Sequence, residues 1–381
     1  MSCFFCGQDA GIAFMFETAL INNLFFLFTA FFTALLLVPL ARRLAFRFHF
    51  FDKPGGRKQH ERAVPPVGGL VIFPAFMVLA ALFGLNSSLN WQIYGWFYTG
   101  LTLLLVTGFF DDRFTVKAWL KFFLQLLAAF LIVVPGQATI YGLGNVFGFG
   151  DFWLGFIGIP FSVLAVMLLI NGMNLMDGLD GLAGGTGFVV ILWLAIAAIL
   201  AGSFAYAGIL LILLGSLGGF LFYNIRHPLR ARADIFLGDA GSLALGLSLA
   251  WFSLHSALPE SHRVLEPMAV AWILALPIFD TCGQFTRRIL QGRHPFDPDQ
   301  HHFHHHFIYA GIPVVRSTPI ILLISFVFGG VGVIGSSFGV PTAILSYSWI
   351  ALLLFHIYMS LRPHRFRRVI SRVRGCFAKG S

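Results

Sequence analysis

The sequence predicts an all-α protein that crosses a membrane many times, and its composition and the spacing of its charges carry this prediction. Of 381 residues, 58% are apolar and 11% are charged, whereas soluble domains average about 25% charged residues. The 45 Phe and 41 Gly residues also exclude a disordered chain, a disulfide scaffold and a coiled coil. Because backbone groups in hydrocarbon must be hydrogen-bonded internally, long apolar runs in such a chain are expected to be helices.

Eleven apolar runs, whose few Lys, Arg, Asp or Glu residues lie within four residues of an end, approach the roughly 20 residues that a bilayer core requires. We expect them to form one membrane domain over residues 1–381. Only Ala201, Gly202 and Ser203 separate the sixth run from the seventh. The expected spans are 18–40, 68–85, 92–110, 118–135, 152–171, 184–202, 204–223, 239–256, 267–282, 318–339 and 341–361.

The basic residues predict the orientation of these spans. If the spans alternate in direction, 24 of the 25 Lys and Arg residues fall on one side, and only Arg263 falls on the other. The positive-inside rule then places the N-terminus outside, the C-terminus in the cytoplasm and residues 362–381 in a basic cytoplasmic tail. The net charge of +9 is therefore mainly a topology signal and does not indicate a nucleic-acid partner.

Eleven of the 16 acidic residues also lie on the predicted cytoplasmic side, where the positive-inside rule does not attract them. Ionisable groups gathered at one membrane depth indicate a functional site. Carboxylates suit a hard cation, and Mg²⁺ typically binds one or two of them together with substrate phosphates. Six lie at the ends of predicted spans, namely Asp111, Asp112, Asp177, Asp180, Asp239 and Asp280.

The spacing of these acids predicts how they are directed. Asp111 and Asp112 should point about 100° apart on a helix, so different partners are expected for them. Asn171, Asn174, Asp177 and Asp180 are three residues apart, and they share one face if that segment is helical throughout.

Basic and imidazole side chains accompany the acids on the same side. A histidine-rich loop suggests zinc first, but the accompanying Arg287, Arg288 and Arg293 favour phosphate oxygens over a metal that they would repel. The candidate substrate-binding side chains are Lys53, Arg57, Lys58 and His60 in the first loop, Lys121 after Asp111, and Arg293, His302, His304 and His305 in the last large loop.

Carboxylates with Mg²⁺ and fixed cations at a membrane surface indicate phosphoryl transfer between a soluble and a lipid substrate. No Walker loop or kinase signature occurs, so the donor is not expected to be held as ATP is. A metal or solute transporter is the alternative. It predicts charged residues near the middle of the spans, and none of the eleven runs contains one.

Several motifs between Asp52 and Phe307 resemble the polyprenyl-phosphate N-acetylhexosamine-1-phosphate transferases of glycosyltransferase family 4. They are the first loop, Asp-Asp-Arg-Phe with Gln125 fourteen residues after Asp111, Asp-Gly-Leu-Asp-Gly, and a final His-x-His-His. The chain is most similar to the WecA-like branch. The resemblance implies transfer of N-acetylglucosamine-1-phosphate from UDP-N-acetylglucosamine to undecaprenyl phosphate in the bacterial inner membrane, with the active site facing the cytoplasm, at the start of cell-surface polysaccharide synthesis.

The same resemblance implies residue roles and partners. Asp239 and Asn174 would ligate Mg²⁺, with Mn²⁺ as the alternative metal. Asp111 and Asp112 would position or deprotonate the lipid phosphate, Asp177 and Asp180 would support metal or nucleotide, and the three histidines would hold the donor diphosphate. Asn171 belongs to the substrate-binding set, and membrane lipids and a second copy of the chain are the further expected partners. Where the family often has Lys, this chain has Trp119, so Lys117 or Lys121 must serve there. Another UDP-N-acetylhexosamine donor remains open.

Overall fold

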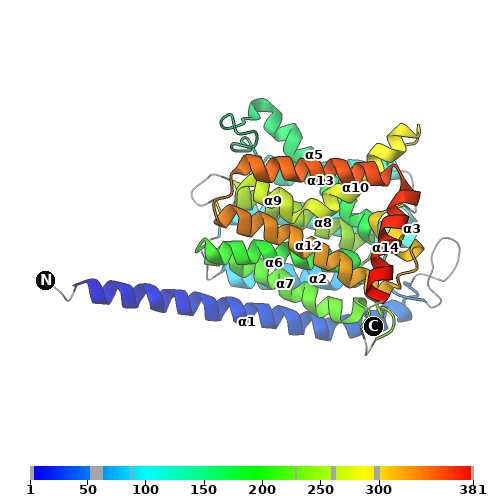
Figure 1. Cartoon of the computed structure of the whole chain (residues 1–381). Coiled ribbons are helices and arrows are strands. Elements are labelled where there is room, and N and C mark those ends of the chain that lie inside the picture. The colour runs from blue at the N-terminus through cyan, green and yellow to red at the C-terminus, as the bar shows by residue number, and fades with distance from the viewer. Residues whose placement is uncertain are drawn as a thin grey trace.

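The computed structural model of the chain is an α-helical bundle (Figure 1). It describes residues 4–51, 63–85, 87, 89–227, 230–258, 263–295 and 301–378, with side chains from residue 17 to residue 371 of these ranges. No β-strand occurs among the described residues, which contain only two isolated β-bridges. The candidate residues Lys53, Arg57, Lys58 and His60 lie outside the described residues.

The helices follow the apolar runs closely. Their bounds are α1 Phe4–Arg47, α2 Gly68–Gly84, α3 Trp91–Phe114, α4 Ala118–Val133, α5 Gly158–Met176, α6 Leu182–Leu200, α7 Phe204–Asn224, α8 Gly238–Ala257, α9 Pro267–Ile273, α10 Ala275–Leu290, α11 Phe303–Tyr309, α12 Val314–Ser337, α13 Thr342–Ser360 and α14 Pro363–Ala378. Each predicted span is therefore mainly helical, and the short break after α6 falls where the sequence places it.

The chain is a multi-pass membrane protein, although the structure identifies fewer spans than the sequence predicts. Among the described residues, seven helices are long and apolar enough to cross a bilayer, and an eighth span results if α9 and α10, bent by 74°, count as one. The helices α2 and α4 contain 17 and 16 residues, short of the roughly 20 that a span needs. The count of eleven and the orientation of the termini stay predictions.

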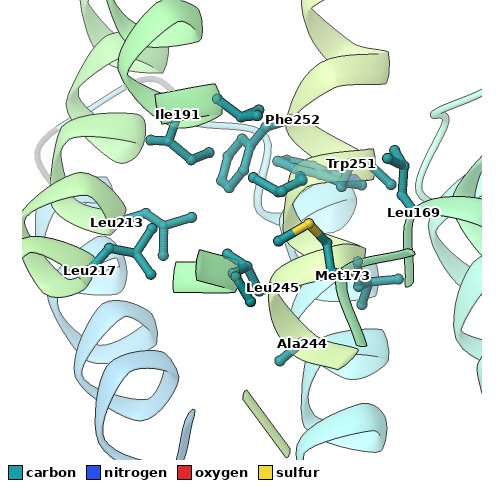
Figure 2. Packing of buried hydrophobic residues seen from close by; sticks show 14 of the residues in the cluster. Leu169, Met173, Ile191, Leu213, Leu217, Ala244, Leu245, Trp251 and Phe252 are labelled. Atoms are coloured by element: carbon teal, nitrogen blue, oxygen red, sulfur yellow. The ribbon is translucent and has the colours of Figure 1, made fainter. Parts of the chain in front are cut away.

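Helix α8 forms the centre of the bundle and packs against α2, α3, α5 and α6. Leu169 and Met173 of α5 and Ile191 of α6 surround its side chains Leu245, Trp251 and Phe252 (Figure 2). The Trp251 ring stacks on Phe97 of α3 at a centroid distance of 4.5 Å. Because these residues are buried inside the protein and not against lipid, packing on all sides holds α8 and both of its ends in position.

Small residues let the neighbouring helices approach the first turn of α8. A Cβ atom on Gly69 would lie 2.1 Å from the Cα of Gly241, and one on Gly108 would lie 2.3 Å from the Cα of Ala240. Close backbone approach at small residues is typical of helix packing in membranes. The backbone N–H groups of Gly68 and Gly69 also donate hydrogen bonds to the carbonyl oxygens of Phe236 and Leu237. The N-terminus of α8 is thereby fixed between α2 and α3.

The Gly108→Ala variant is expected to be destabilised by about 1–3 kcal/mol, because overpacking at a backbone contact forces helices apart. It should also lose the activity expected from the sequence motifs, since α3 carries Asp111 and Asp112 and α8 carries Asp239. Gly95→Ala is the matched control on the same helix, because nothing lies within 4 Å of a Cβ atom there. The unfolding temperature in detergent and the activity should be measured for both variants. Equal stability of the two would contradict this account of the α3–α8 contact.

Candidate active site

An ammonium group joins two carboxylates at the end of the bundle where α3 ends and α8 begins. Lys121 on the first turn of α4 donates to Oδ2 of Asp111 at 2.6 Å and to Oδ2 of Asp239 at 3.1 Å. The side chains of Lys121 and Asp111 are 18% and 10% exposed, and that of Asp239 is 32% exposed. Only Asp239 in this trio therefore offers substantial surface to an incoming substrate.

Asp112 has a different set of partners. Its carboxylate accepts hydrogen bonds from the backbone N–H groups of Asp239 at 3.0 Å and Ala240 at 3.2 Å. A carboxylate at a helix N-terminus satisfies unpaired amides and complements the helix dipole. The preceding Gly238 has φ +77°, and a Cβ there would lie 2.4 Å from the Pro66 carbonyl oxygen. The prediction that Asp111 and Asp112 have different partners is confirmed, and Asp112 holds α8 and Asp239 in position.

The end of α5 supplies two amides to the site. Asn174 donates to Oδ1 of Asp239 at 2.6 Å and lies 2.9 Å from Oγ of Ser242. Asn171 is directed elsewhere, since its amide donates to Oε1 of Gln125 and to the Met167 carbonyl oxygen. Asn174 therefore orients Asp239, whereas Asn171 connects α5 to α4.

Asp177 and Asp180 do not continue the helical row of the two asparagines. Helix α5 ends at Met176, and the backbone of Asp177 has ψ 45°. Asp180 accepts a hydrogen bond from Nε of Arg226 at 2.6 Å. The shared face expected for a helical segment is absent because the segment Asp177–Gly181 forms a turn before α6.

Asp177 is the least compensated carboxyl group in the site. Burial, followed by the nearby carboxylates of Asp239, Asp112 and Asp180, raises its pKa to about 8, although one backbone hydrogen bond from Gly238 acts in the opposite direction. Removing a carboxylate from water beside like charges favours its protonated form. The site therefore contains more negative charge than Lys121 neutralises.

The histidine-rich segment forms a second group that adjoins the first. Nδ1 of His302 lies 3.1 Å from Oδ2 of Asp280, whose other oxygen accepts from the backbone N–H of Phe303 at 2.8 Å. Asp280 is thus not part of the carboxylate group that the sequence predicts, but fixes the start of α11. His304 is buried, which lowers the pKa of its imidazole well below its usual value. A Cβ on Gly178 would lie 2.7 Å from Nε2 of His304, so His304 borders the Asp177 turn.

The three predicted histidines differ in exposure. His302 is buried between Asp280 and Arg288, whose Nη2 lies 3.3 Å from its Nε2. His305 stacks near Tyr309 and is partly exposed. Arg293 lies exposed just beyond α10, where its backbone N–H donates to the Arg288 carbonyl oxygen. His302 therefore has a positioning role, whereas His305 and Arg293 remain accessible.

Sequence reasoning missed several members of the site. Ser242 stands one helical turn after Asp239 and could have been found from that spacing. Gly238 and Arg226 carry no local signal, since their partners Asp112 and Asp180 are far away in the sequence. Gln125 was recognised as part of a motif, but its hydrogen bond to Asn171 was not expected.

The donor groups fit a divalent cation that substrate oxygens help to hold. Within the described ranges, no three His, Cys, Asp or Glu side chains are arranged to hold a metal ion unaided. The uncompensated Asp177, together with Asp239 and the amide of Asn174, matches the carboxylate-plus-phosphate coordination usual for Mg²⁺.

Comparison with known proteins identifies the family. Residues 94–257, which include most of α3 and all of α4 to α8, match the model for glycosyl transferase family 4. A probable undecaprenyl-phosphate N-acetylglucosaminyl 1-phosphate transferase of Bacillus subtilis (strain 168) is 32% identical over 90% of this chain and 89% of its own length. The chain belongs to glycosyl transferase family 4. Two proteins named undecaprenyl-phosphate alpha-N-acetylglucosaminyl 1-phosphate transferase are also similar to it. The Yersinia pestis protein is 29% identical, covering 87% of this chain and 90% of its own, and the Escherichia coli O157:H7 protein is 28% identical, covering 92% of each.

Family membership confirms the resemblance drawn from the motifs and makes the protein a transferase. The matched region contains Asp111, Asp112, Lys121, Asn174 and Asp239. The His-x-His-His segment lies beyond the family model.

Proposed function

We propose that this protein transfers N-acetylglucosamine-1-phosphate from UDP-N-acetylglucosamine to undecaprenyl phosphate, releasing UMP. The observation that carries the proposal is the Asp111–Lys121–Asp239 arrangement beside Asn174 and the buried Asp177. The similar relatives are named as undecaprenyl-phosphate N-acetylglucosaminyl 1-phosphate transferases, which supports the proposed acceptor and the proposed transferred group. The product would be a lipid-linked diphospho-sugar of the kind that starts O-antigen or enterobacterial common antigen synthesis.

The proposed reaction is an in-line displacement at phosphorus. An oxygen of the lipid phosphate attacks the β-phosphorus of the donor. The bond between this phosphorus and the bridging oxygen breaks, and its electron pair leaves on UMP. A phosphate monoester is already largely ionised near pH 7, since its second pKa is about 6, so a general base would contribute little. Positioning and charge neutralisation are the main demands on the protein.

Different side chains provide the positioning and the charge neutralisation. Lys121 offers fixed positive charge near Asp239, and Asp112 keeps the start of α8 in place. His305 and Arg293 are accessible cationic or hydrogen-bonding groups for the donor diphosphate. Asp111, held by Lys121 and by the backbone N–H of Val116, serves as an orienting group in this scheme.

Mg²⁺ is the proposed cofactor, with Mn²⁺ as its substitute. Asp239, Asp177 and Asn174 would hold it, and the bound ion would neutralise charge on the donor diphosphate. Asn174 presents its Nδ2 to Asp239, so its amide would have to turn for Oδ1 to act as a ligand. The charge imbalance at Asp177 supports a divalent cation at this position.

Mg²⁺ binding is expected to release protons. The raised pKa of Asp177, about 8, means that the metal-free folded protein retains a proton that an unfolded chain loses near pH 4. The free energy of unfolding should therefore fall as the pH rises between about 4 and 8 without metal. At pH 7 about one proton should leave per Mg²⁺ bound. Calorimetry in buffers of different ionisation enthalpy measures this release, and an Asp177→Asn variant that released as many protons would contradict the assignment.

Purified protein incubated with radiolabelled UDP-N-acetylglucosamine, undecaprenyl phosphate and Mg²⁺ tests the proposed function. We expect labelled lipid and UMP in equal amounts, and no product after EDTA treatment. UDP-N-acetylgalactosamine in a parallel reaction tests the donor. Failure to form labelled lipid, or formation insensitive to EDTA, would reject the proposed reaction or its metal, respectively.

We further propose that the protein lies in the bacterial inner membrane with this site facing the cytoplasm. The positive-inside distribution supports this orientation. Cysteine labelling of the tail after residue 371 and of the segment before residue 17 in intact cells, compared with opened cells, tests it.

A further inference from the structure

The end of the chain has an unusual charge distribution. Residues 361–381 contain six Arg and one Lys but no Asp or Glu, and the last acidic residue of the protein is Asp299. The basic groups of this segment therefore have no acidic partners nearby in the sequence. Such a segment attracts an anionic surface.

The segment also lies where a membrane surface is expected. Helix α13 passes the length and apolarity criteria for a span, and only Leu361 and Arg362 separate its last residue from α14. Helix α14 then runs across the end of the bundle, transverse to the spans (Figure 1). Polybasic segments next to a span act at lipid headgroups within about a Debye length.

The two faces of α14 have different surroundings. Phe366 and Ile370, one turn apart, are 8% and 7% exposed and face the protein. Arg365 and Arg368 are exposed, three residues apart, on the other side. Nη1 of Arg365 donates to the Tyr358 hydroxyl at 3.0 Å. We call the exposed side the Arg365–Arg368 face.

The buried face connects α14 to the histidine-bearing helix α11. The Phe366 ring lies 4.5 Å from the ring of His306 and 5.7 Å from that of Phe303, between centroids. The guanidinium of Arg367 lies 4.2 Å from the centre of the Tyr309 ring. Because α11 has only seven residues, too few for stability by itself, these contacts help to hold its histidines beside the Asp177 turn.

We propose that the Arg365–Arg368 face binds anionic phospholipid headgroups at the membrane surface where α13 ends, and that this binding stabilises α11 through Phe366 and Arg367. The lipid-binding step is inferred from the positive charge of the segment and its short distance from the span. The stabilisation of α11 is inferred from the ring contacts of Phe366 and Arg367. The consequence for activity rests on the proposed transferase function, whereas the binding step does not.

Hydrogen exchange of the full-length protein in nanodiscs tests the binding step. In phosphatidylcholine with phosphatidylglycerol, amides of residues 363–378 and 303–309 should exchange more slowly than in phosphatidylcholine alone. Each arginine of the face is expected to contribute about fivefold to this protection, from about 1 kcal/mol per basic residue near an anionic surface. Arg365→Gln/Arg368→Gln should therefore remove most of the difference between the two lipid compositions.

Two control variants separate the proposed site from general effects. Arg43→Gln/Arg316→Gln removes two exposed charges, one in the last turns of α1 and one in the first turn of α12, and should keep the protection. Tyr358→Phe removes only the hydroxyl that Arg365 contacts and should also keep it. Equal protection of wild-type α14 in both compositions, or equal loss in the control double variant, would overturn the proposal.

Activity measured in the same nanodiscs tests the coupling to α11. The wild type should be more active with phosphatidylglycerol, and the Arg365→Gln/Arg368→Gln variant should respond less to this lipid. Protection of α14 that arises only when undecaprenyl phosphate is added would assign the face to the substrate and reject the proposal. An inactive protein that still shows lipid-dependent protection would reject the transferase function and leave the binding site intact.

Discussion

Replacing Asp239 by Asn is expected to lower the transfer rate by about 10²–10³-fold, the range found when one group that stabilises transition-state charge is removed. The substitution keeps the side-chain volume and the backbone N–H that donates to Asp112, so the fold should persist. It removes the negative charge that faces Lys121 and replaces one oxygen of the carboxylate proposed to ligate Mg²⁺ by an NH2 group. Initial rates with saturating donor and lipid, measured at several Mg²⁺ concentrations, test this expectation.

Asp234→Asn is the matched control for this experiment. Asp234 forms ion pairs with Arg42 and Arg230 and is 34% exposed, and exposed ion pairs contribute only about 0–1 kcal/mol. Its loss should leave the transfer rate nearly unchanged. If Asp239→Asn retained full activity and unchanged Mg²⁺ dependence, the site would have to be placed elsewhere.

The acidic site could be predicted from the sequence because charged residues are rare in a membrane-spanning chain, so that each one indicates a loop, a helix end or a functional group. In a chain with 11% charged residues, acids at the ends of apolar runs such as Asp111 and Asp239 are conspicuous, and alternation of the spans brings those ends to one side. The helices expected around them are present. Lys121, which the sequence places in the substrate-binding set, contacts both carboxylates, and this contact was not predicted.

The errors arose where the backbone leaves the helix. The spacing of Asn174 and Asp177 fits a helical row, but Gly178 and Gly181 follow, and Gly181 has φ +78°. Glycine in that region ends a helix readily. The pairing of Asp280 with His302 joins residues 22 positions apart across a turn, a contact that neither helical nor strand periodicity encodes.

The role of Asp112 was hidden for a related reason. The carboxylate oxygens of Asp112 accept hydrogen bonds from backbone N–H groups at the start of α8. Gly238, with φ +77° beside Pro66, directs these N–H groups towards Asp112. Side-chain chemistry alone suggests a carboxylate acting on substrate. The backbone geometry assigns it to the helix N-terminus, where a carboxylate satisfies amides that have no partner within the helix.

Lys121→Met is expected to reduce both stability and activity strongly. It would leave Asp111 and Asp239 facing each other without the ammonium group between them, and loss of one member of a buried ion pair typically costs about 3–5 kcal/mol. Because Asp239 is about a third exposed, water should reduce this cost to about 2–3 kcal/mol. Lys117→Met, at an exposed residue just before α4, should have a much smaller effect on both quantities.

A double variant separates the two contributions of Lys121. In Lys121→Met/Asp111→Asn, one of the opposing charges is removed, so the unfolding temperature should recover towards that of the wild type. Activity should stay low, because the fixed cation beside the proposed phosphate position is still missing. With the Asp111→Asn single variant included, a double-mutant cycle in the free energy of unfolding measures the coupling between Lys121 and Asp111. Recovery of activity together with stability would instead mean that Lys121 only compensates the carboxylates, and that the positive charge for the substrate comes from the proposed metal and the accessible groups near α11.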